Sequence, residues 1–438
     1  MAGAANRYWK AAEIPAESAT LDNGLRVIAH RDSKAPIVAV FVAYHAGSAR
    51  ESRGKTALAH LAEHLMFCGS EHAPGSYFLP LEQAGASSIN AHVREDYTGC
   101  FEAVPTGAFD LALWMESERM GWLAGALDGE KFEAQREVVR NELIQRESEP
   151  YGVAPRLLAE HSWPQRHPYS HPVNGLREDL DNLSLEDARR WVKTCIGAAN
   201  ATLVIAGDVE PARAIEKACR YFDDVPPGVA LKPLQAPPPM DGGAPKSRVF
   251  EYRAPAARIY RVWNVPQYAA SQCAALELAC ETLSGGVGSL LWRALVEEDR
   301  LAVEVGGEFR GRSLGSQVVI WVTAAQGKDA RAVDAAFERA MSRFLANGPG
   351  DGDLDAARMR ILARFLRGIE RMCGPGSCAE ALAEASVIAS MPGFHAVRLR
   401  IVESLPRQQT IEIARQWLKT PSLRLEFRPL REGAAPKP

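Results

Sequence analysis

The first half of the chain alternates short strand-like segments with longer helical ones. Strand patterns are runs rich in β-branched and aromatic residues, whereas helical patterns repeat apolar positions every three to four residues. Asp22-Asn23-Gly24 predicts a turn within the first strand region. The pattern predicts strands at 19–30, 36–44, the end of 87–104 and 201–209, and helices around 57–65, 109–127, 131–147 and 185–195.

The second half repeats this order faintly. Two strands are predicted in each of the segments 247–263 and 301–324, and the helical region 271–296 between them is interrupted at Gly285-Gly286. Further helices are predicted at 330–345, 354–369 and 408–418. The repeated order predicts an α+β fold with two similar domains, each an antiparallel-rich sheet covered by helices.

A stretch rich in proline and glycine separates the two halves. Residues 226–246 carry no periodic pattern, and their proline content predicts an extended, fairly stiff linker. The chain has 438 residues, which exceeds what one hydrophobic core usually supports. We therefore expect one domain at 1–225, a linker at 226–246 and a second domain at 247–438.

Composition narrows the class of protein. Apolar residues make up 47% and charged residues 24% of the chain, as in ordinary globular proteins. The net charge of −3 gives no reason to expect nucleic acid or a membrane as a partner, and no apolar run approaches the ~18 residues that span a bilayer. No signal-peptide pattern is visible at the start, so we expect a soluble protein of the cytoplasm or the periplasm.

One pentapeptide, His60-Leu61-Ala62-Glu63-His64, indicates a chemistry. Positions four apart lie on the same face of a helix, so His60 and His64 can bind one zinc ion. Glu63 lies beside them, where a carboxylate can accept a proton from water. The order matches the inverted zincin pattern H-x-x-E-H. A chance match is the alternative, since such a pentapeptide occurs in roughly two chains of this composition in a hundred.

A catalytic zinc ion needs a third protein ligand from elsewhere in the chain. The segment 132–150 is strongly helical and offers several carboxylates. Among them, Glu142 shares a helix face with Gln135, Val138 and Val139. The pattern by itself leaves the choice among these carboxylates open.

Longer motifs around these residues resemble a known family. Glu142 follows His64 by 78 positions and ends the run Gln135–Glu142, which fits a pattern like E-R-x-V-I-x-x-E. Other matching segments are 21–36, 46–51, 85–98, 167–175, 199–209 and, more loosely, 283–324. The chain resembles the pitrilysin/insulinase family of zinc peptidases, in the branch similar to mitochondrial processing peptidase.

The resemblance implies a role for each of these residues. His60, His64 and Glu142 would bind Zn²⁺, and Glu63 would be the general base that takes a proton from the activated water. Asn90 and Ala91 match the family's substrate-binding edge strand, to which an extended peptide adds as a further strand. The implied protein is an endopeptidase for extended or unfolded peptides, with two domains in a clamshell and the zinc-binding catalytic domain at 1–225.

The chain departs from the family pattern at two places. Gln135 replaces a glutamate that faces the zinc site, which removes a charge and predicts weaker zinc binding or water activation. Active members of the branch also carry an Arg and a Tyr, seven positions apart, where Val296 and Val303 stand here, and no Tyr follows Tyr268. Loss of such donors typically costs a hundred- to a thousand-fold in rate.

The domain at 247–438 is therefore expected to be a homologous second domain that lacks the Arg/Tyr pair. We expect the chain to be the zinc-bearing subunit of a heterodimer, in which a sister subunit without the zinc motif supplies these two residues. Two alternatives stay open. One is a non-catalytic structural subunit of a processing-peptidase-like complex, and the other is a self-sufficient homodimeric peptidase.

Overall fold

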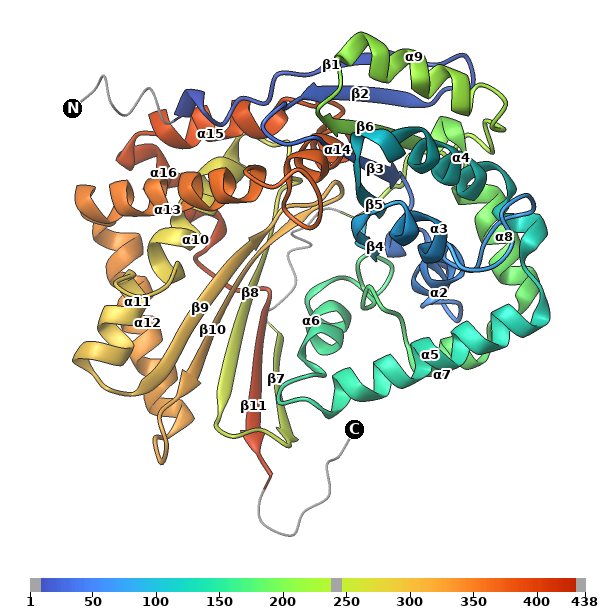
Figure 1. Cartoon of the computed structure of the whole chain (residues 1–438). Coiled ribbons are helices and arrows are strands. Elements are labelled where there is room, and N and C mark those ends of the chain that lie inside the picture. The colour runs from blue at the N-terminus through green and yellow to red at the C-terminus, as the bar shows by residue number, and fades with distance from the viewer. Residues whose placement is uncertain (1–8, 238–245, 431–438) are drawn as a thin grey trace. The chain divides into compact units, whose positions relative to one another are not determined.

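The computed structural model describes residues 9–237 and 246–430, which form two compact units (Figure 1). Unit 1 comprises the described parts of Met1–Ile144, His171–Leu234 and Phe365–Ala396. Unit 2 comprises those of Gln145–Ser170, Gln235–Arg364 and Val397–Pro438. Each unit is built on one sheet with helices packed on it. The predicted α+β fold with two sheet-and-helix domains is confirmed.

The sheet of unit 1 has six strands in the order β1-β2-β6-β3-β5-β4, and only the pair β2–β6 is parallel. The strands are β1 (Glu17–Thr20), β2 (Arg26–Arg31), β3 (Ile37–Tyr44), β4 (Ser87–Val93), β5 (Thr98–Pro105) and β6 (Ala201–Gly207). The central strands β3 and β6 are almost wholly buried, because helices cover both faces. Strand β4 forms one edge of the sheet.

The helices of unit 1 lie on both faces of this sheet. They are α2 (Leu58–Leu65), α3 (Phe78–Gln83), α4 (Phe109–Ala126), most of α5 (Gly129–Ser148), α7 (Arg177–Asp181), α8 (Leu185–Cys195), α9 (Pro211–Phe222) and α14 (Cys378–Ala389), with short 3-10 turns η1 (Ser48–Arg50), η2 (Thr106–Ala108) and η3 (Ala198–Asn200). Val40 and Val42 of β3 face the core that contains α2, whereas Phe41 and Ala43 face α14. This alternation is the period of two expected of a strand.

The sheet of unit 2 has the order β7-β11-β8-β10-β9, and only the pair β7–β11 is parallel. Its strands are β7 (Lys246–Tyr252), β8 (Arg258–Val265), β9 (Ala302–Arg310), β10 (Ser316–Ala324) and β11 (Leu423–Pro429). The helices are α6 (Ala154–Ser162), α10 (Gln272–Ser284), α11 (Leu290–Trp292), the π-helix η4 (Arg293–Glu298), α12 (Ala330–Asn347), most of α13 (Asp351–Ile369), most of α15 (Phe394–Ser404) and α16 (Arg407–Trp417).

The two sheets share one topology. Without β1, the strands of unit 1 lie in the order first, fifth, second, fourth, third along the chain, and the strands of unit 2 lie in the same order. In both sheets the parallel pair joins the first of these strands to the last. The shared order supports the duplication that the faint sequence repeat predicts.

Each sheet also receives a helix from the other half of the sequence. Leu382 and Ala383 of α14 pack on the sheet of unit 1, and Leu157 and Leu158 of α6 pack on the sheet of unit 2. Neither helix is predicted from the sequence pattern, and neither are α9 and β11. The functional division into 1–225, 226–246 and 247–438 stays a prediction. Residues 226–237 form no helix or strand, and 238–245 lie outside the described residues.

The other predicted elements match the structure closely. The helices expected at 109–127, 131–147, 185–195, 330–345, 354–369 and 408–418 correspond to α4, α5, α8, α12, α13 and α16. The strand pairs of the second half correspond to β7 with β8 and β9 with β10. Within 9–237 and 246–430, no helix is long and apolar enough to cross a membrane.

Candidate metal centre

Helix α2 carries the motif that predicts zinc binding. Leu58, Leu61 and Leu65 are buried in the core of unit 1 and hold one side of the helix there. His60 is 5% exposed, whereas Glu63 and His64 are half-buried. Because the leucines follow helical spacing, the His and Glu side chains leave the helix beside this apolar stripe.

The structure brings His60, His64 and Glu142 together. Nε2 of His60 lies 3.6 Å and Nε2 of His64 lies 3.5 Å from Oε2 of Glu142. One ligand atom of each residue lies within 4.8 Å of the other two. In the part of the chain that the structure describes, no other group of three His, Cys, Asp or Glu residues meets this condition. We call these three residues, the candidate site for a metal ion, the metal centre.

The donor atoms of the metal centre fit a tetrahedral zinc ion. Zn–N and Zn–O bonds of about 2.0–2.2 Å place neighbouring ligand atoms roughly 3.3–3.6 Å apart. The His60–Glu142 and His64–Glu142 separations of 3.6 and 3.5 Å lie in this range, and they are long for a hydrogen bond. Two imidazoles and one carboxylate are also the donor set of many catalytic zinc sites, which keep a fourth position open.

Helix α5 positions Glu142 beside the two histidines. Val139 and Leu143 are 0% and 8% exposed, so they fix this stretch of the helix on the core of unit 1. Glu142 lies next to Leu143, and its side chain is 29% exposed. The packing of α5 on this core therefore brings Glu142 close to His64, although the two residues lie 78 positions apart in the sequence.

Gln135 lies on α5 two turns before Glu142 and contacts the loop that follows α2. Burial raises the pKa of the Cys68 thiol, while Lys131 and a hydrogen bond with Gln135 oppose that rise. The structure thus places the Gln135 side chain at Cys68, a few residues beyond the end of the zinc-motif helix.

Asn90 and Ala91 lie on the edge strand β4. Asn90 is exposed, and its Oδ1 accepts a hydrogen bond of 2.8 Å from the main-chain N–H of Ala91. A bulge between Ser87 and Asn90, with Ser88 at φ +56°, interrupts pairing with β5 just before these residues. An edge strand offers its outer main-chain groups to an incoming peptide, and both predicted residues lie on such an edge.

The sequence analysis does not predict a buried charge cluster that the structure shows in unit 1. Arg119 lies over the Tyr77 ring at 4.1 Å, bonds Glu116 through Nε at 3.1 Å, and approaches Glu102 at 3.9 Å. Burial raises the pKa of Glu102, and the neighbouring Glu116 adds to the rise. The sequence signal is the run Glu116–Arg119, four polar residues inside a long helix that all prove to be buried.

A second cluster ties β4 to α14. Glu380 accepts hydrogen bonds from the Tyr97 hydroxyl at 2.9 Å and from Arg94 at 3.1 Å, and Nε2 of His92 lies 2.9 Å from it. Burial opposes ionisation, but contact with His92, Arg94 and the Gly376 N–H lowers the pKa of Glu380 to about 2. No sequence signal identifies this cluster, because Glu380 comes from the other half of the chain.

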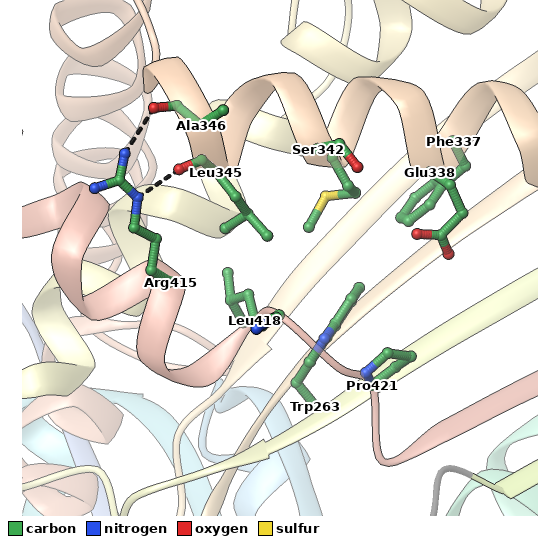
Figure 2. Close-up of a pocket in the computed structure, with 11 residues that line it drawn as sticks. Trp263, Phe337, Glu338, Ser342, Leu345, Ala346, Arg415, Leu418 and Pro421 are labelled. Atoms are coloured by element: carbon green, nitrogen blue, oxygen red, sulfur yellow. Dashed lines mark hydrogen bonds between the residues drawn. The ribbon is translucent and has the colours of Figure 1, made fainter.

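Two cavities in the described part of the chain are lined by residues other than those of the metal centre. A cavity of about 510 Å³ in unit 1 lies between α4 and α8. Another of about 630 Å³ in unit 2 lies between α12, α16 and Trp263. Figure 2 shows Arg415 at this second cavity, where it donates to the carbonyls of Leu345 at 2.5 Å and Ala346 at 2.6 Å. Arg415 therefore caps the C-terminus of α12.

Val296 and Val303, which stand where the family pattern has Arg and Tyr, lie in unit 2. Val296 belongs to the π-helix η4 and is half-buried, and Val303 lies on the edge strand β9 with 56% exposure. The nearby Arg293 already bonds the Gly288 carbonyl at 2.6 Å and Asp353 at 2.9 Å. Neither valine can donate a hydrogen bond from its side chain.

Comparison with known families agrees with the geometry. The family model described as insulinase (Peptidase family M16) matches residues 26–173, and the model described as Peptidase M16 inactive domain matches residues 182–361. Together these two models of one family cover most of the chain. The chain belongs to the M16 peptidase family. The expected resemblance to insulinase-type peptidases is confirmed at this level.

Several curated relatives of this M16 chain are named for proteolysis or for subunits of larger assemblies. A protein named Zinc protease PqqE from Helicobacter pylori is 27% identical over 291 residues, 65% of each chain. A probable mitochondrial-processing peptidase subunit beta from Schizosaccharomyces pombe is 25% identical over 50% of this chain and 48% of the relative. Human cytochrome b-c1 complex subunit 1 is 26% identical over 47% and 42%. The chain thus spans 42 to 65% of the length of these relatives.

Solved structures show the same fold. A protease from Helicobacter pylori superposes with a TM-score of 0.87 at 21% identity, over 95% of this chain and 100% of that one. A structure titled peptidase M16 inactive domain from Pseudomonas fluorescens superposes with a TM-score of 0.82 at 16% identity, over 97% and 100%. The M16 chain therefore shares its two-sheet fold with proteins of quite different sequence.

Proposed function

We propose that this M16 chain is a zinc-dependent endopeptidase subunit, with zinc bound by His60, His64 and Glu142 and with Glu63 as the general base. The observation that carries the proposal is the convergence of the three donor atoms within 4.8 Å, at separations that suit a tetrahedral ion. The relative named Zinc protease PqqE supports the same activity.

Different residues of the chain would carry out different parts of the reaction. A zinc ion would supply Lewis-acid activation of the water and of the scissile carbonyl. Glu63 follows His60 by three positions on α2, so its carboxylate can take a proton from the attacking water and deliver it to the leaving amine. The side chain of His64, like that of Glu63, is half-buried, which leaves this side of the helix accessible to a peptide.

The edge strand β4 would orient the substrate. An extended peptide pairing with β4 gains main-chain hydrogen bonds, so chains in an unfolded conformation are the favoured substrates. The amide of Asn90 is exposed on this strand and can exchange its bond with the Ala91 N–H for one with the peptide backbone. Specificity for particular side chains would come from surfaces beyond β4.

A sister subunit would complete the enzyme. Val296 and Val303 stand where active members of the processing-peptidase branch carry Arg and Tyr, so the chain lacks two donors for the substrate and the developing oxyanion. Relatives named as a processing-peptidase subunit beta and as a subunit of the cytochrome b-c1 complex support assembly with another chain. The E. coli relative PqqL is described as a periplasmic protease, which supports the periplasm among the two expected compartments.

A non-catalytic structural subunit is the second candidate. It is favoured by the match of residues 182–361 to the inactive-domain model and by the likeness to cytochrome b-c1 complex subunit 1. A scaffold has no need of a zinc centre, however, and the chain keeps His60, Glu63, His64 and Glu142. Zinc content separates the two candidates.

The test is cleavage of a quenched fluorescent peptide library by the purified chain, with zinc measured on the same sample. We expect bound zinc and slow cleavage, abolished in Glu63→Gln while zinc is retained. A metal-free chain without activity would favour the scaffold. Rapid cleavage by the chain alone would remove the need for a sister subunit.

A further inference from the structure

We propose that Glu51 is a positioning residue of the metal centre, whose buried carboxylate holds the start of α2 and thereby fixes His60 against His64 and Glu142. The inference rests on the proposed zinc function and extends it to a residue outside the H-x-x-E-H motif. Glu51 belongs to the segment 46–51, and its neighbour His171 belongs to 167–175. The family resemblance covers both segments but assigns neither a role.

The Glu51 carboxylate caps the N-terminus of α2. Its Oε1 accepts a hydrogen bond of 2.7 Å from the N–H of Ala59, and the N–H groups of Ala57 and Leu58 also act to lower the pKa of this carboxyl group. The first amides of a helix lack partners within the helix, and a carboxylate suits its partial positive charge. The N-cap residue of α2 is Ala57, whose side chain cannot accept a hydrogen bond.

The loop 171–176 also packs against the start of α2. Nδ1 of His171 lies 3.6 Å from Oε2 of Glu51, and both side chains are largely or wholly buried. Gly175 has φ +74°, and a Cβ there would lie 2.0 Å from the main-chain nitrogen of Ala57. Only glycine can let the 171–176 loop pack so closely on α2.

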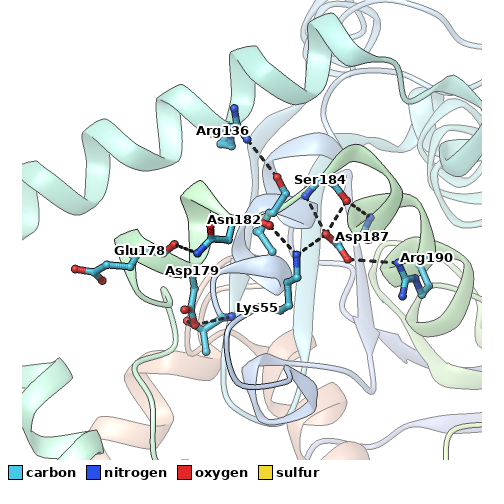
Figure 3. A network of polar contacts seen from close by, with 10 residues as sticks. Lys55, Arg136, Glu178, Asp179, Asn182, Ser184, Asp187 and Arg190 are labelled. Atoms are coloured by element: carbon cyan, nitrogen blue, oxygen red, sulfur yellow. Dashed lines mark hydrogen bonds and ion pairs between the residues drawn. The ribbon is translucent and has the colours of Figure 1, made fainter.

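Polar contacts hold the residues just before α2. The Thr56 hydroxyl donates to Asp179 at 2.6 Å and accepts from the Leu176 N–H at 2.9 Å. Figure 3 shows the side chain of Lys55 pointing toward Asp187 and Asn182, which it contacts at 2.8 Å and 2.6 Å. These contacts hold the residues that precede α2, while Glu51 holds a main-chain N–H group of the helix itself.

The position of His60 explains why this cap matters for the metal. His60 is the third residue of α2 and directly follows Ala59, whose amide bonds Glu51. A metal site needs its ligands held within about 0.5 Å of their working positions. A helix start that frays would move His60 more than His64, which lies a turn further along.

Glutamine is the informative replacement at this position. Burial raises the pKa of Glu51, while the N–H groups of Ala59, Ala57 and Leu58 oppose that rise. These groups are donors, so the side chain at position 51 has to act as an acceptor. In Glu51→Gln one oxygen becomes an NH₂ group, which cannot accept a bond from an amide. The change keeps the volume of the side chain and one acceptor for the Ala59 N–H, and it removes the negative charge that an ionised carboxylate places at the start of the helix.

The experiment measures zinc affinity by chelator competition and amide hydrogen exchange in α2 for the wild-type full chain and Glu51→Gln. We expect zinc binding at least about 10-fold weaker in the variant, faster exchange at residues 58–61, and a lower kcat with a KM within about twofold. Glu426→Gln is the matched control, because the Glu426 side chain in unit 2 is 2% exposed, close to the 0% of the Glu51 side chain. It is expected to lower stability and leave zinc affinity unchanged.

Several outcomes would overturn the inference. Zinc affinity in Glu51→Gln equal to wild type would do so, and so would an equal loss in Glu426→Gln, since the effect would then be general destabilisation. If Glu51→Gln gives no cooperative melt, Glu51→Asp takes its place, with intermediate zinc affinity expected and wild-type affinity contradicting the role. A wild-type chain that binds no zinc would overturn the proposed function as well, which separates the two failures.

Discussion

At the scale of single residues, Gln135 is the most informative difference from the family pattern. It lies on α5 two turns before Glu142, and it hydrogen-bonds with Cys68. Gln135→Glu adds a negative charge on the helix that carries the proposed ligand Glu142, so we expect zinc affinity to rise about 10-fold. Chelator competition measures this change, and unchanged affinity would show that a charge at position 135 does not reach the metal.

Glu116 is expected to be essential for stability. Arg119 is 1% exposed and bonds Glu116, so Glu116→Ala would leave a buried guanidinium without its nearest carboxylate. Such a loss costs about 3–5 kcal/mol of unfolding free energy, which urea denaturation measures. The control Glu137→Ala removes an exposed partner of Arg140 and should cost less than about 1 kcal/mol. Similar losses in the two variants would contradict this assignment.

The residues that could be predicted from the sequence are those whose chemistry is local. His60, Glu63 and His64 follow from helical spacing alone. Glu142 could be singled out only through the family resemblance, because several carboxylates share its helix. Glu51 and Glu380 could not be predicted, since burial and partners from distant segments decide which carboxylate becomes a cap or an ion-pair partner.

At the scale of elements, the strands and most long helices could be predicted because each has a regular apolar period. Helix α14 could not, because Cys378–Ala389 is buried on almost every side and so shows no amphipathic stripe. Helix α6 has only nine residues, too few for a secure pattern. Each of these two helices packs on a sheet formed mainly by the other half of the sequence. No local sequence pattern encodes such long-range packing.

The contact between α14 and β4 predicts a pH dependence of stability. The pKa of Glu380 is about 2 in the folded chain against an ordinary value of 4.5, so its stabilising contribution is present above about pH 5 and is lost as pH falls toward 2. The difference corresponds to about 3 kcal/mol. Urea unfolding at pH 3 to 7 should show Glu380→Gln far less stable than wild type at pH 7 and closer to it at pH 3. A gap independent of pH would contradict this role.

At the scale of the whole molecule, the exchanged helices predict that the two halves depend on one another to fold. A fragment 1–225 lacks α14, so it exposes the buried face formed by Ile28, Phe41, Phe101 and Val204. Exposed apolar surfaces of this kind promote association. We expect fragment 1–225 to aggregate or bind a hydrophobic dye, and co-expression with 247–438 to restore a soluble complex. A soluble fragment with a cooperative melt would contradict this expectation.

The function proposed for the whole chain depends on the zinc centre that we propose at His60, His64 and Glu142. The decisive measurement is the zinc content of the purified full-length chain, equilibrated in a zinc buffer beside Glu142→Gln. We predict about one zinc ion per wild-type chain and a large loss of zinc from the variant, because three protein ligands are needed to hold a catalytic ion. A wild-type chain without zinc, or equal zinc in both proteins, would contradict the assignment.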